Sequence, residues 1–502
     1  MNQNDVKKND PLYSISPIDG RYREKTKDLR PYFSEAGLIR YRILVEIRYL
    51  VYFLLYLQNP SIKKNIQTNA EKKFIERIRI LSIDEKSIFS YFDNLGNNDI
   101  EIVKQIETKG FEEIPATNHD VKAVEYFIKH KLEENFSHNP QRLSEYKELV
   151  HFALTSEDVN NLAYSLLIRN SINNVLLVNY KEILQILHNM AASYASLPMM
   201  SRTHGQAASP TTFGKEILIF IHRMEQELAD LKNLKLNVKL NGATGNYNAH
   251  LAALPSIDWD QFSRDFIKYL ETDADKEQVK IQFNPVTPQI EPHDSICKLF
   301  HILFRLNTIL TDFCQDMWRY ISDAWIRQKP KKGEVGSSTM PHKINPIDFE
   351  NAEGNFQMAN ALLHFFTAKL PVSRLQRDLS DSTIQRNIGV AVSHILIALK
   401  SLQKGLNKID VNEQIILAEL KNQPILITEA IQTILRREGV ANPYELLKKL
   451  SRGKEINLTA IQDFIRELPV TEETKNSLLK LKPENYLGLA EKIVKKYLSS
   501  IK

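Results

Sequence analysis

Three long stretches of this chain lack both glycine and proline, and their apolar residues recur at helical spacing. The stretches are 157–197, 215–241 and 293–329. Steps of three and four residues between apolar positions are typical of a helix that buries one face. Helices in globular proteins average only about 11–12 residues, so runs of this length favour a bundle of long helices. The pattern predicts such a bundle at residues 144–406.

The sequence on either side of the bundle predicts two further helical domains. Residues 1–143 contain shorter stretches in which apolar residues recur at helical spacing, the clearest of them over 34–57. Residues 407–502 contain short helical segments interrupted by prolines, and proline interrupts helices because it lacks a backbone N–H and fixes φ. The expected fold is therefore mainly α, in three domains.

Composition supports this expectation and narrows the class of protein. Only 16 of the 502 residues are glycine, and 43% are hydrophobic, which favours helix over sheet in an ordinary globular protein. The formal net charge of +5 is small for this length. It argues against a dedicated nucleic-acid-binding protein and not against a local cationic pocket.

The sequence also bears on compartment. The two cysteines, Cys297 and Cys314, fall within one expected helix, where reduced packing residues of a cytosolic protein are expected. No stretch approaches the roughly 20 uncharged apolar residues of a membrane span. The polar N-terminus lacks the apolar region of a secretory signal. We therefore expect a cytoplasmic protein with no membrane partner.

The candidate chemistry gathers where the long helical stretches stop. The most prominent loop is KGEVGSSTMPHKINPIDFENAEGN, residues 332–355. Paired glycines let backbone N–H groups approach an anion, Ser337 can exchange a proton, and Lys343 can hold a carboxylate. Long loops between rigid elements are more often functional than connecting.

Other polar stretches lie at the remaining ends. HFALTSEDVNNL (151–162) carries the capping chemistry of a helix N-terminus, which also suits an anion. SRTHGQAASP (201–210) places His204 on a tight connector, and TNHD (117–120) places His119 before a helix. For each isolated histidine a structural role is the ordinary alternative.

The expected helix over 157–197 constrains how these loops meet. At 1.5 Å per residue it would span roughly 60 Å, which separates Thr155 and Ser156 from His204. Either these are unrelated structural loops, or one site is shared between antiparallel subunits. The pattern alone leaves both readings open.

Five separated motifs carry a resemblance to a known family. GSSTMPHKINP (336–346) resembles the signature loop of the fumarase/aspartase superfamily, whose members are helical lyases that release fumarate. One family of this superfamily, the adenylosuccinate lyases, is resembled by four other segments of the chain. They are TNHDVKAVEYF, HFALTSEDVNNL, SRTHGQAASPTTFGKE and SRLQRDLSDSTIQRN. The resemblance extends from SPIDGRY (16–22) to at least residue 387, with a similar third domain beyond.

This resemblance implies a mainly α homotetramer whose active sites each take residues from three subunits. It implies elimination of fumarate from adenylosuccinate, giving AMP, and from succinyl-aminoimidazole-carboxamide ribotide. It implies no cofactor and no metal, and the sequence has no His/Cys/Asp spacing that makes a ligand set.

The resemblance also implies catalytic roles. Ser337 is expected to be the general base and His204 the general acid that protonates the departing nitrogen. Glu350 corresponds to the carboxylate that orients this histidine, and His119 to a second site histidine. The carbanion that forms needs cationic and N–H donors where its charge develops, and Lys343 is expected to help supply them.

Substrate-binding positions follow from the same resemblance. We expect Arg21, Tyr22, Ser382 and Arg386 near the nucleotide phosphate, Arg377 on the nucleotide side, Thr155, Ser156, Lys343 and Asn345 on the succinyl side, and Asn118, Asp120 and Gln289 as further contacts. Some relatives have arginine at the position of Asn351, and the stretch 131–146 has no assigned role.

Other functions compete with this one. A serine hydrolase using Ser337 and His204 would need a G-x-S-x-G elbow, which is absent from the sequence. A related lyase acting on argininosuccinate is a closer alternative. A catalytically inactive helical scaffold is a third, but a scaffold has no need of Ser337, Lys343, His204 and Glu350 together.

Overall fold

The computed structural model describes residues 11–78, 83–137, 143–271, 278–329, 340, 343–451 and 457–500. The chain forms two compact units, each made of several stretches. Unit 1 comprises 1–178, 227–307 and 355–397, and unit 2 comprises 179–226, 308–354 and 398–502. The three domains expected from the sequence stay a prediction, because these units are discontinuous along the chain.

The elements of unit 1 are mostly helices. They are α1 (Arg30–Phe33), α2 (Glu35–Gln58), α3 (Pro60–Asn65), α4 (Asn69–Arg77), α5 (Glu85–Asp93), α6 (Asn97–Thr108), α7 (Asp120–Phe136), α8 (Ser156–Ser171), the π-helix η5 (Ile172–Leu176), β3 (Lys235–Val238), α11 (Asn248–Ala253), α12 (Trp259–Leu270), β4 (Lys280–Phe283) and α15 (Ser380–Gln385). Short 3-10 turns, η2 (Pro11–Tyr13), η3 (Lys27–Leu29) and η4 (Leu143–Leu149), complete it.

Long helices belong partly to each unit, and shorter elements complete unit 2. The long ones are α9 (Leu177–Ser193), α10 (Phe213–Asn233), α13 (Asp294–Ser322), α14 (Ile347–Lys369) and α16 (Ile388–Leu406). The others are β1 (Pro198–Thr203), β2 (Gln206–Thr212), β5 (Ile326–Gln328), β6 (Ile409–Val411), α17 (Glu413–Lys421), η6 (Pro424–Ile427), α18 (Thr428–Arg437), α19 (Pro443–Ser451), α20 (Leu458–Glu467), α21 (Glu472–Leu479), η7 (Pro483–Asn485) and α22 (Ala490–Ser500).

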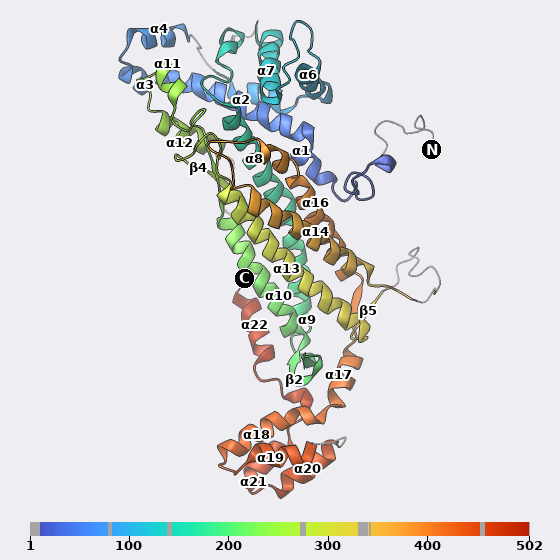
Figure 1. The fold of residues 1–502 in the computed structure, drawn as a ribbon. Helices are drawn as coiled ribbons and strands as arrows, with labels where there is room; N and C mark the ends of the chain where they lie inside the picture. The colour runs from blue at the N-terminus through green and yellow to red at the C-terminus, as the bar shows by residue number, and fades with distance from the viewer. Residues whose placement is uncertain are drawn as a thin grey trace. The chain divides into compact units, whose positions relative to one another are not determined.

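The expectation of a mainly α fold with long helices is confirmed (Figure 1). The stretch predicted as one helix over 157–197 is helical without a gap from Ser156 to Ser193, but it changes to a π-helix at η5. A π-turn accommodates one extra residue per turn and often marks a functional region. The helix ends before Pro198, where β1 begins, so the prediction is wrong over its last residues.

The other two long predictions are wrong at their C-terminal ends. The expected helix over 215–241 stops at Asn233, and β3 follows, paired in parallel with β4. The expected helix over 293–329 stops at Ser322, and β5 then pairs antiparallel with β6. In both cases a short two-stranded ribbon satisfies backbone groups that a longer helix would have used internally.

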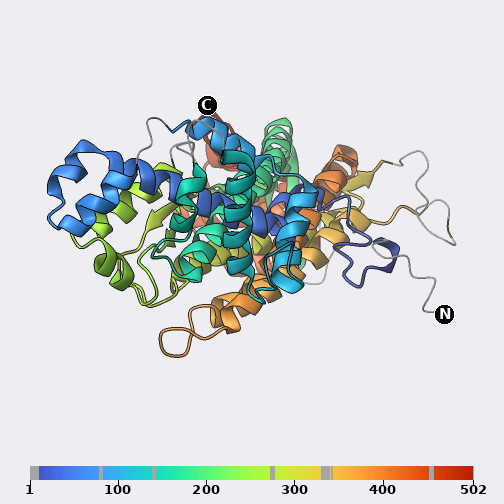
Figure 2. The same cartoon turned by 90° about the horizontal axis from the view of Figure 1, so that it is seen from above.

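The N-terminal helices of unit 1 pack around α2 (Figure 2). Ser34 caps α2 by accepting a hydrogen bond from the backbone N–H of Gly37 at 3.0 Å, as N-cap serines do. The central part of α2 is buried against α8, α5 and α7. Two charged residues, Arg42 and Glu46, interrupt this mostly apolar buried face. Arg42 donates a hydrogen bond to Asp120 at the candidate site.

The C-terminal elements of unit 2 form a small apolar core of their own. Its fully or nearly buried members are Ile427, Ile431, Leu435, Leu447, Ile461, Ile465, Leu468 and Leu478. Prolines begin η6, α19 and η7, as the first position of a helix tolerates. The interruptions expected in this region are therefore confirmed.

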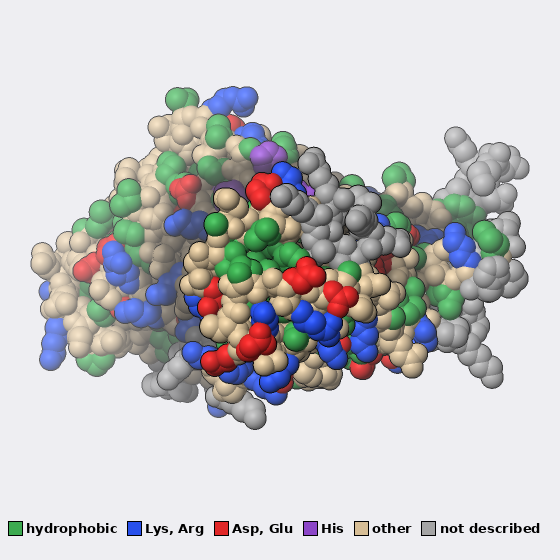
Figure 3. Space-filling model, turned by 90° about the horizontal axis from the view of Figure 1, so that it is seen from below, with side chains coloured by type: hydrophobic (Ala, Val, Ile, Leu, Met, Phe, Trp, Pro, Cys, Tyr) green, Lys and Arg blue, Asp and Glu red, His purple; other side chains and the backbone are tan. Residues whose placement is uncertain are grey.

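Charges of both signs are interspersed on the face seen from below (Figure 3), in keeping with the small net charge. No helix in the described residues is both long enough and apolar enough to span a membrane. Cys297 and Cys314 are buried and unpaired.

Candidate functional site

The N-terminus of α8 is the most strongly fixed part of the candidate site. Thr155 is its N-cap, and the Thr155 backbone N–H donates to Asp158 Oδ2 at 2.9 Å. Asp158 Oδ1 accepts from Lys239 Nζ at 2.6 Å, and both side chains are fully buried. The helix start predicted from TSED is confirmed. The buried ion pair holds Thr155 and Ser156 in place, since a buried charge is tolerated only when it is paired.

The same carboxylate fixes a glycine-containing loop beside α8. Asp158 Oδ1 also accepts from the backbone N–H groups of Asn241 and Gly242, at 3.1 and 3.3 Å. Gly245 has φ +78°, and a Cβ there would lie 2.0 Å from the carbonyl oxygen of Thr287. Only glycine fits this approach. The loop thereby anchors the segment that carries the half-buried Gln289.

His119 lies at the N-cap of α7, facing Ser156. Its Nδ1 accepts from the backbone N–H of Lys122 at 3.3 Å, and its Nε2 lies 3.5 Å from Ser156 Oγ. Because Nδ1 accepts a hydrogen bond, the neutral ring carries its proton on Nε2. The exposed ring therefore presents an N–H toward the space beside Ser156. The preceding Asn118 is left-handed, with φ 49°, which turns the chain into the helix.

Asp120, the first residue of α7, joins two arginines. Its Oδ2 accepts from Arg42 Nη2 at 2.7 Å and from Arg386 Nη2 at 3.1 Å. Arg386 Nη1 also donates to Glu35 Oε2 at 2.7 Å. Burial favours a raised pKa for Asp120, but the Arg42 charge and hydrogen bond outweigh it and lower the pKa. In this arrangement Asp120 orients Arg386.

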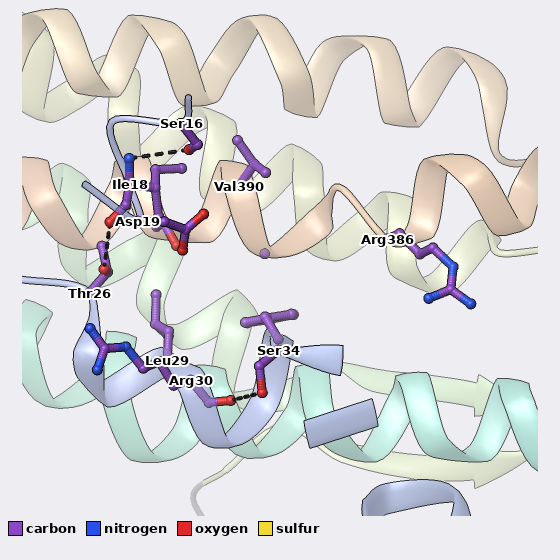
Figure 4. A pocket seen from close by; sticks show the side chains of 12 residues that line it. Ser16, Ile18, Asp19, Thr26, Leu29, Arg30, Ser34, Arg386 and Val390 are labelled. Carbon is purple, nitrogen blue, oxygen red and sulfur yellow. Dashed lines mark hydrogen bonds between the residues drawn. The ribbon is translucent and has the colours of Figure 1, made fainter. Parts of the chain in front are cut away.

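A cavity of about 240 Å³ lies next to this arginine (Figure 4). Its polar lining includes Ser16, Asp19, Arg30, Ser34 and Arg386, with apolar residues such as Ile18 and Val390 completing the wall. The turn 16–26 that forms one side also carries Arg21, which is exposed, and Tyr22. The turn is held by backbone hydrogen bonds from Tyr22 to Pro17 and from Gly20 to Ser16.

A buried charged cluster lies behind Thr155 and Ser156. Glu157 is 2% exposed, and its Oε2 lies 3.2 Å from Arg377 Nη2. Burial raises the pKa of Glu157 to about 7, although the Arg377 charge opposes the rise. His293 Nε2 lies 3.7 Å from Asp381 Oδ2. We call Glu157, Arg377, Asp381 and His293 the buried charge cluster.

Ser382 follows Asp381 of this cluster in α15. Its backbone N–H donates to Asp381 Oδ1 at 2.7 Å. Burial favours a raised pKa for Asp381, but the hydrogen bonds from His293 and from Ser382 lower it. Four of the expected substrate-binding residues in unit 1 thus take part in hydrogen bonds or ion pairs: Ser156, Arg377, Ser382 and Arg386.

His204 belongs to unit 2 and sits at the tip of a β-hairpin. Thr203 pairs with Gln206, so His204 and Gly205 form a two-residue loop. Their φ values are 53° and 74°, and two positive φ values in such a loop define a type I′ turn. Arg202 and Ser209 tie the ribbon to Glu419 and Glu429. The imidazole is exposed.

The remaining expected residues of unit 2 lie at the start of α14. Lys343 is exposed, and Asn345 is half-buried. Glu350 accepts from Trp318 Nε1 at 3.1 Å. No hydrogen bond or ion pair joins Glu350 to His204 among the described residues of one chain. Ser337 lies outside the described residues.

Sequence reasoning missed several residues that build the site. Arg42, Lys239 and His293 were assigned no role, nor was Asp381, although it lies within SRLQRDLSDSTIQRN. Glu157 was interpreted only as capping chemistry. A detectable signal existed for Arg42, because an arginine within an apolar helical run needs a buried partner. No group of three or more His, Cys, Asp or Glu is placed to hold a metal in the described ranges.

Comparison with known proteins decides the family. Residues 20–359 match the family described as lyase, and residues 373–487 match the family described as adenylosuccinate lyase C-terminal. Adenylosuccinate lyase from Buchnera aphidicola (subsp. Acyrthosiphon pisum, strain APS) is 44% identical, covering 96% of this chain and 98% of its own. The chain belongs to the adenylosuccinate lyase family.

Other members of the family are similarly close. The adenylosuccinate lyase of Haemophilus influenzae is 42% identical, covering 97% of this chain and 98% of its own. That of Escherichia coli K12 is 42% identical, covering 95% and 97%. The adenylosuccinate lyase family thus accounts for nearly the whole chain, and membership makes the chain a carbon–nitrogen lyase.

Solved structures confirm the fumarase-like fold of this family member. Fumarate lyase from Mesorhizobium sp. BNC1 superimposes with a TM-score of 0.66 at 14% identity, covering 94% of this chain and 97% of its own. A 3-carboxy-cis,cis-muconate lactonizing enzyme from Pseudomonas putida also gives 0.66, at 19% identity, covering 94% and 96%. At these identities the likeness is one of fold.

Proposed function

We propose that this chain eliminates fumarate from adenylosuccinate, giving AMP, and from succinyl-aminoimidazole-carboxamide ribotide. The observation that carries the proposal is the 44% identity to a named adenylosuccinate lyase over 96% of the chain. The framework of His119, Ser156, Arg377 and Arg386 in unit 1 supports it, since a substrate with a phosphate and two carboxylates needs several cations and N–H donors. A cytoplasmic location and a cofactor-free reaction are part of the proposal.

The difficult step is removal of a proton from the carbon next to a carboxylate. The resulting carbanion is stabilised when its charge spreads into that carboxylate and meets fixed donors. We assign Ser337 as the base, with Lys343 and Asn345 holding the succinyl group. A serine hydroxyl is a poor base in water, so its deprotonation requires a cationic and water-excluded setting.

The leaving nitrogen must receive a proton as the C–N bond breaks. We assign this role to His204, oriented by Glu350. Its place at a two-residue turn supports the assignment, because the ribbon projects one imidazole beyond the last strand pair. Within the chain, Glu350 accepts a hydrogen bond from Trp318, and we propose that it reaches the His204 of a neighbouring subunit.

The nucleotide is proposed to bind unit 1. Arg21, Tyr22, Ser382 and Arg386 would hold the phosphate, and the cavity that Arg386 lines supports this assignment. Thr155 and Ser156 would bind a succinyl carboxylate with the backbone N–H groups of α8, which are a natural anion site. His119 would position the substrate through Nε2.

Assembly is proposed to be a homotetramer with three subunits contributing to each site. The long helical run between Ser156 and Ser193 supports this arrangement, because it separates the Thr155 loop from the His204 hairpin along one chain. An antiparallel neighbour would place the start of one such run beside the end of another.

A turnover assay tests the function. Purified protein is expected to release equimolar AMP and fumarate from adenylosuccinate without added metal or cofactor. The reaction is monitored by the decrease in substrate absorbance, and the products are identified by chromatography. Argininosuccinate, treated identically, is expected to stay intact. If the protein cleaved argininosuccinate and left adenylosuccinate intact, its activity would be that of an argininosuccinate lyase and the proposal would be wrong.

Subunit mixing tests the shared site. Ser337→Ala and Thr155→Ala proteins, each nearly inactive, are expected to regain activity when unfolded together and refolded, because some sites then receive both intact residues. Mass measurement on differently tagged chains confirms that mixed tetramers have formed. Mixed tetramers that remain as inactive as the parents would rule out sharing between subunits.

A further inference from the structure

The buried charge cluster contains more acid than base around the cation expected to meet the substrate. Arg377 faces Glu157 at 3.2 Å, and Asp381 on α15 adds a second carboxylate nearby. Lys239, the other neighbouring cation, is already paired with Asp158 at 2.6 Å. A guanidinium flanked by two ionised carboxylates offers little net positive charge to an incoming anion.

The two carboxylates are not equally supported. Asp381 Oδ1 accepts a backbone hydrogen bond from Ser382 at 2.7 Å, and its other oxygen faces His293. Glu157 is 2% exposed, and in the described part of the chain no backbone N–H donates to its carboxylate. An ionised carboxylate is stabilised by donated hydrogen bonds and destabilised by burial. Glu157 is therefore the member of the pair that binds a proton more readily.

Arg377 retains unused hydrogen-bonding capacity. Its Nη2 contacts Glu157, whereas its buried Nε has no partner among the described residues. Its side chain is 19% exposed, whereas that of Glu157 is 2% exposed. The arrangement thus links a solvent-accessible cation to a carboxylate that solvent hardly reaches.

We propose that Glu157 takes up a proton when an anionic group of the nucleotide binds Arg377. The inference rests on the proposed function, since that function places the nucleotide at Arg377. The charged and titratable groups that face Glu157 are Arg377, Asp381, His293 and Lys239. An anion bound at Arg377 adds negative charge beside Glu157 and favours its neutral form. By linkage, a neutral Glu157 strengthens anion binding equally.

Glu157 is a positioning residue in this scheme, because it acts through Arg377. The ordinary pKa of the carboxyl, raised by burial to about 7, places the proton exchange near neutral pH. The wild-type protein is expected to bind AMP more tightly as pH falls from 8.5 to 6. Coupling between sites typically changes affinity by 5- to 150-fold, and we expect about tenfold here.

The test uses the assembled protein and AMP, titrated calorimetrically. At pH 8.0 the AMP phosphate, with a second pKa near 6, is ionised throughout, so proton uptake reports the protein. Wild-type protein, measured in two buffers of different ionisation enthalpy, is expected to take up a fraction of a proton per AMP bound. Absence of uptake would overturn the proposal, whether or not any variant folds.

Glu157→Gln provides the second measurement. The amide imitates the protonated acid, so AMP affinity at pH 8.5 is expected to rise about tenfold over wild type, with equal affinities near pH 6. Loss of a merely structural contact would weaken binding instead, and that result would overturn the proposal. Asp93→Asn, which breaks the remote pair with Arg48, is the matched control and should keep the wild-type pH dependence. Release of fumarate from adenylosuccinate by the wild-type protein tests the proposed function independently of these binding measurements.

Discussion

Replacing Ser337 by alanine is expected to lower turnover of adenylosuccinate by about 10²- to 10⁴-fold, the range attributed to general acid–base groups. Replacing His204 by glutamine should have an effect of the same order, because the leaving nitrogen would depart without its proton. The His204 side chain is exposed, so its replacement is expected to leave the fold intact. Steady-state kinetics at saturating substrate, with light scattering to follow assembly, measures both.

Controls separate chemistry from structure in these variants. Ser338→Ala changes the neighbouring serine and is expected to lower turnover by less than tenfold. A Ser337→Ala or His204→Gln protein that dissociates or unfolds would make that residue structural. Wild-type rates in either intact variant would remove it from the mechanism.

The Lys239→Met substitution is expected to cause the largest loss of stability. Lys239 and Asp158 are both fully buried, and removal of one partner leaves an uncompensated charge. Such a loss costs about 3–5 kcal/mol. Asp158, which joins Thr155 to the 241–242 loop, would then be a buried carboxylate without its cation at the N-terminus of α8. Urea unfolding at a fixed protein concentration measures the change.

A double-mutant cycle sharpens this prediction. Asp158→Leu combined with Lys239→Met removes both charges and is expected to be less destabilising than the sum of the single changes. Lys268→Met breaks the exposed pair with Asp265 and is expected to leave the unfolding midpoint unchanged. Additive effects at positions 158 and 239 would show that the buried pair contributes little.

The long helices were predictable because spacing alone dictates them, whereas their ends were not. In the segment LKLNVKL, residues 234–240, apolar residues alternate with polar ones, which is the period of a strand. Because this segment contains neither glycine nor proline, the predicted helix was extended through it and ended too late. The strand forms because β4, far along the chain, pairs with it, and a partner at that separation has no local signature.

In the candidate site, too, the features that depend on local sequence were predictable and the contacts between distant residues were not. The helix start at Thr155 and the turn at His204 were predictable because capping and turn chemistry are local. Their expected roles in the site came from the family resemblance. The ion pairs of Glu157 with Arg377 and of Asp158 with Lys239 join residues from distant stretches. Their partners are chosen by tertiary packing, so the sequence offers no spacing from which to infer them.

The β1–β2 hairpin has a consequence for tolerated changes in length. A two-residue turn fixes the register of the pairs next to it, and side chains alternate between the two faces of each strand from the bulge at Met200/Ser201 to the turn. Inserting or deleting one residue in β1 or β2 would reverse that alternation and displace the imidazole of His204 from the apex. Point substitutions along the ribbon should therefore be accepted far more readily than any single-residue insertion or deletion.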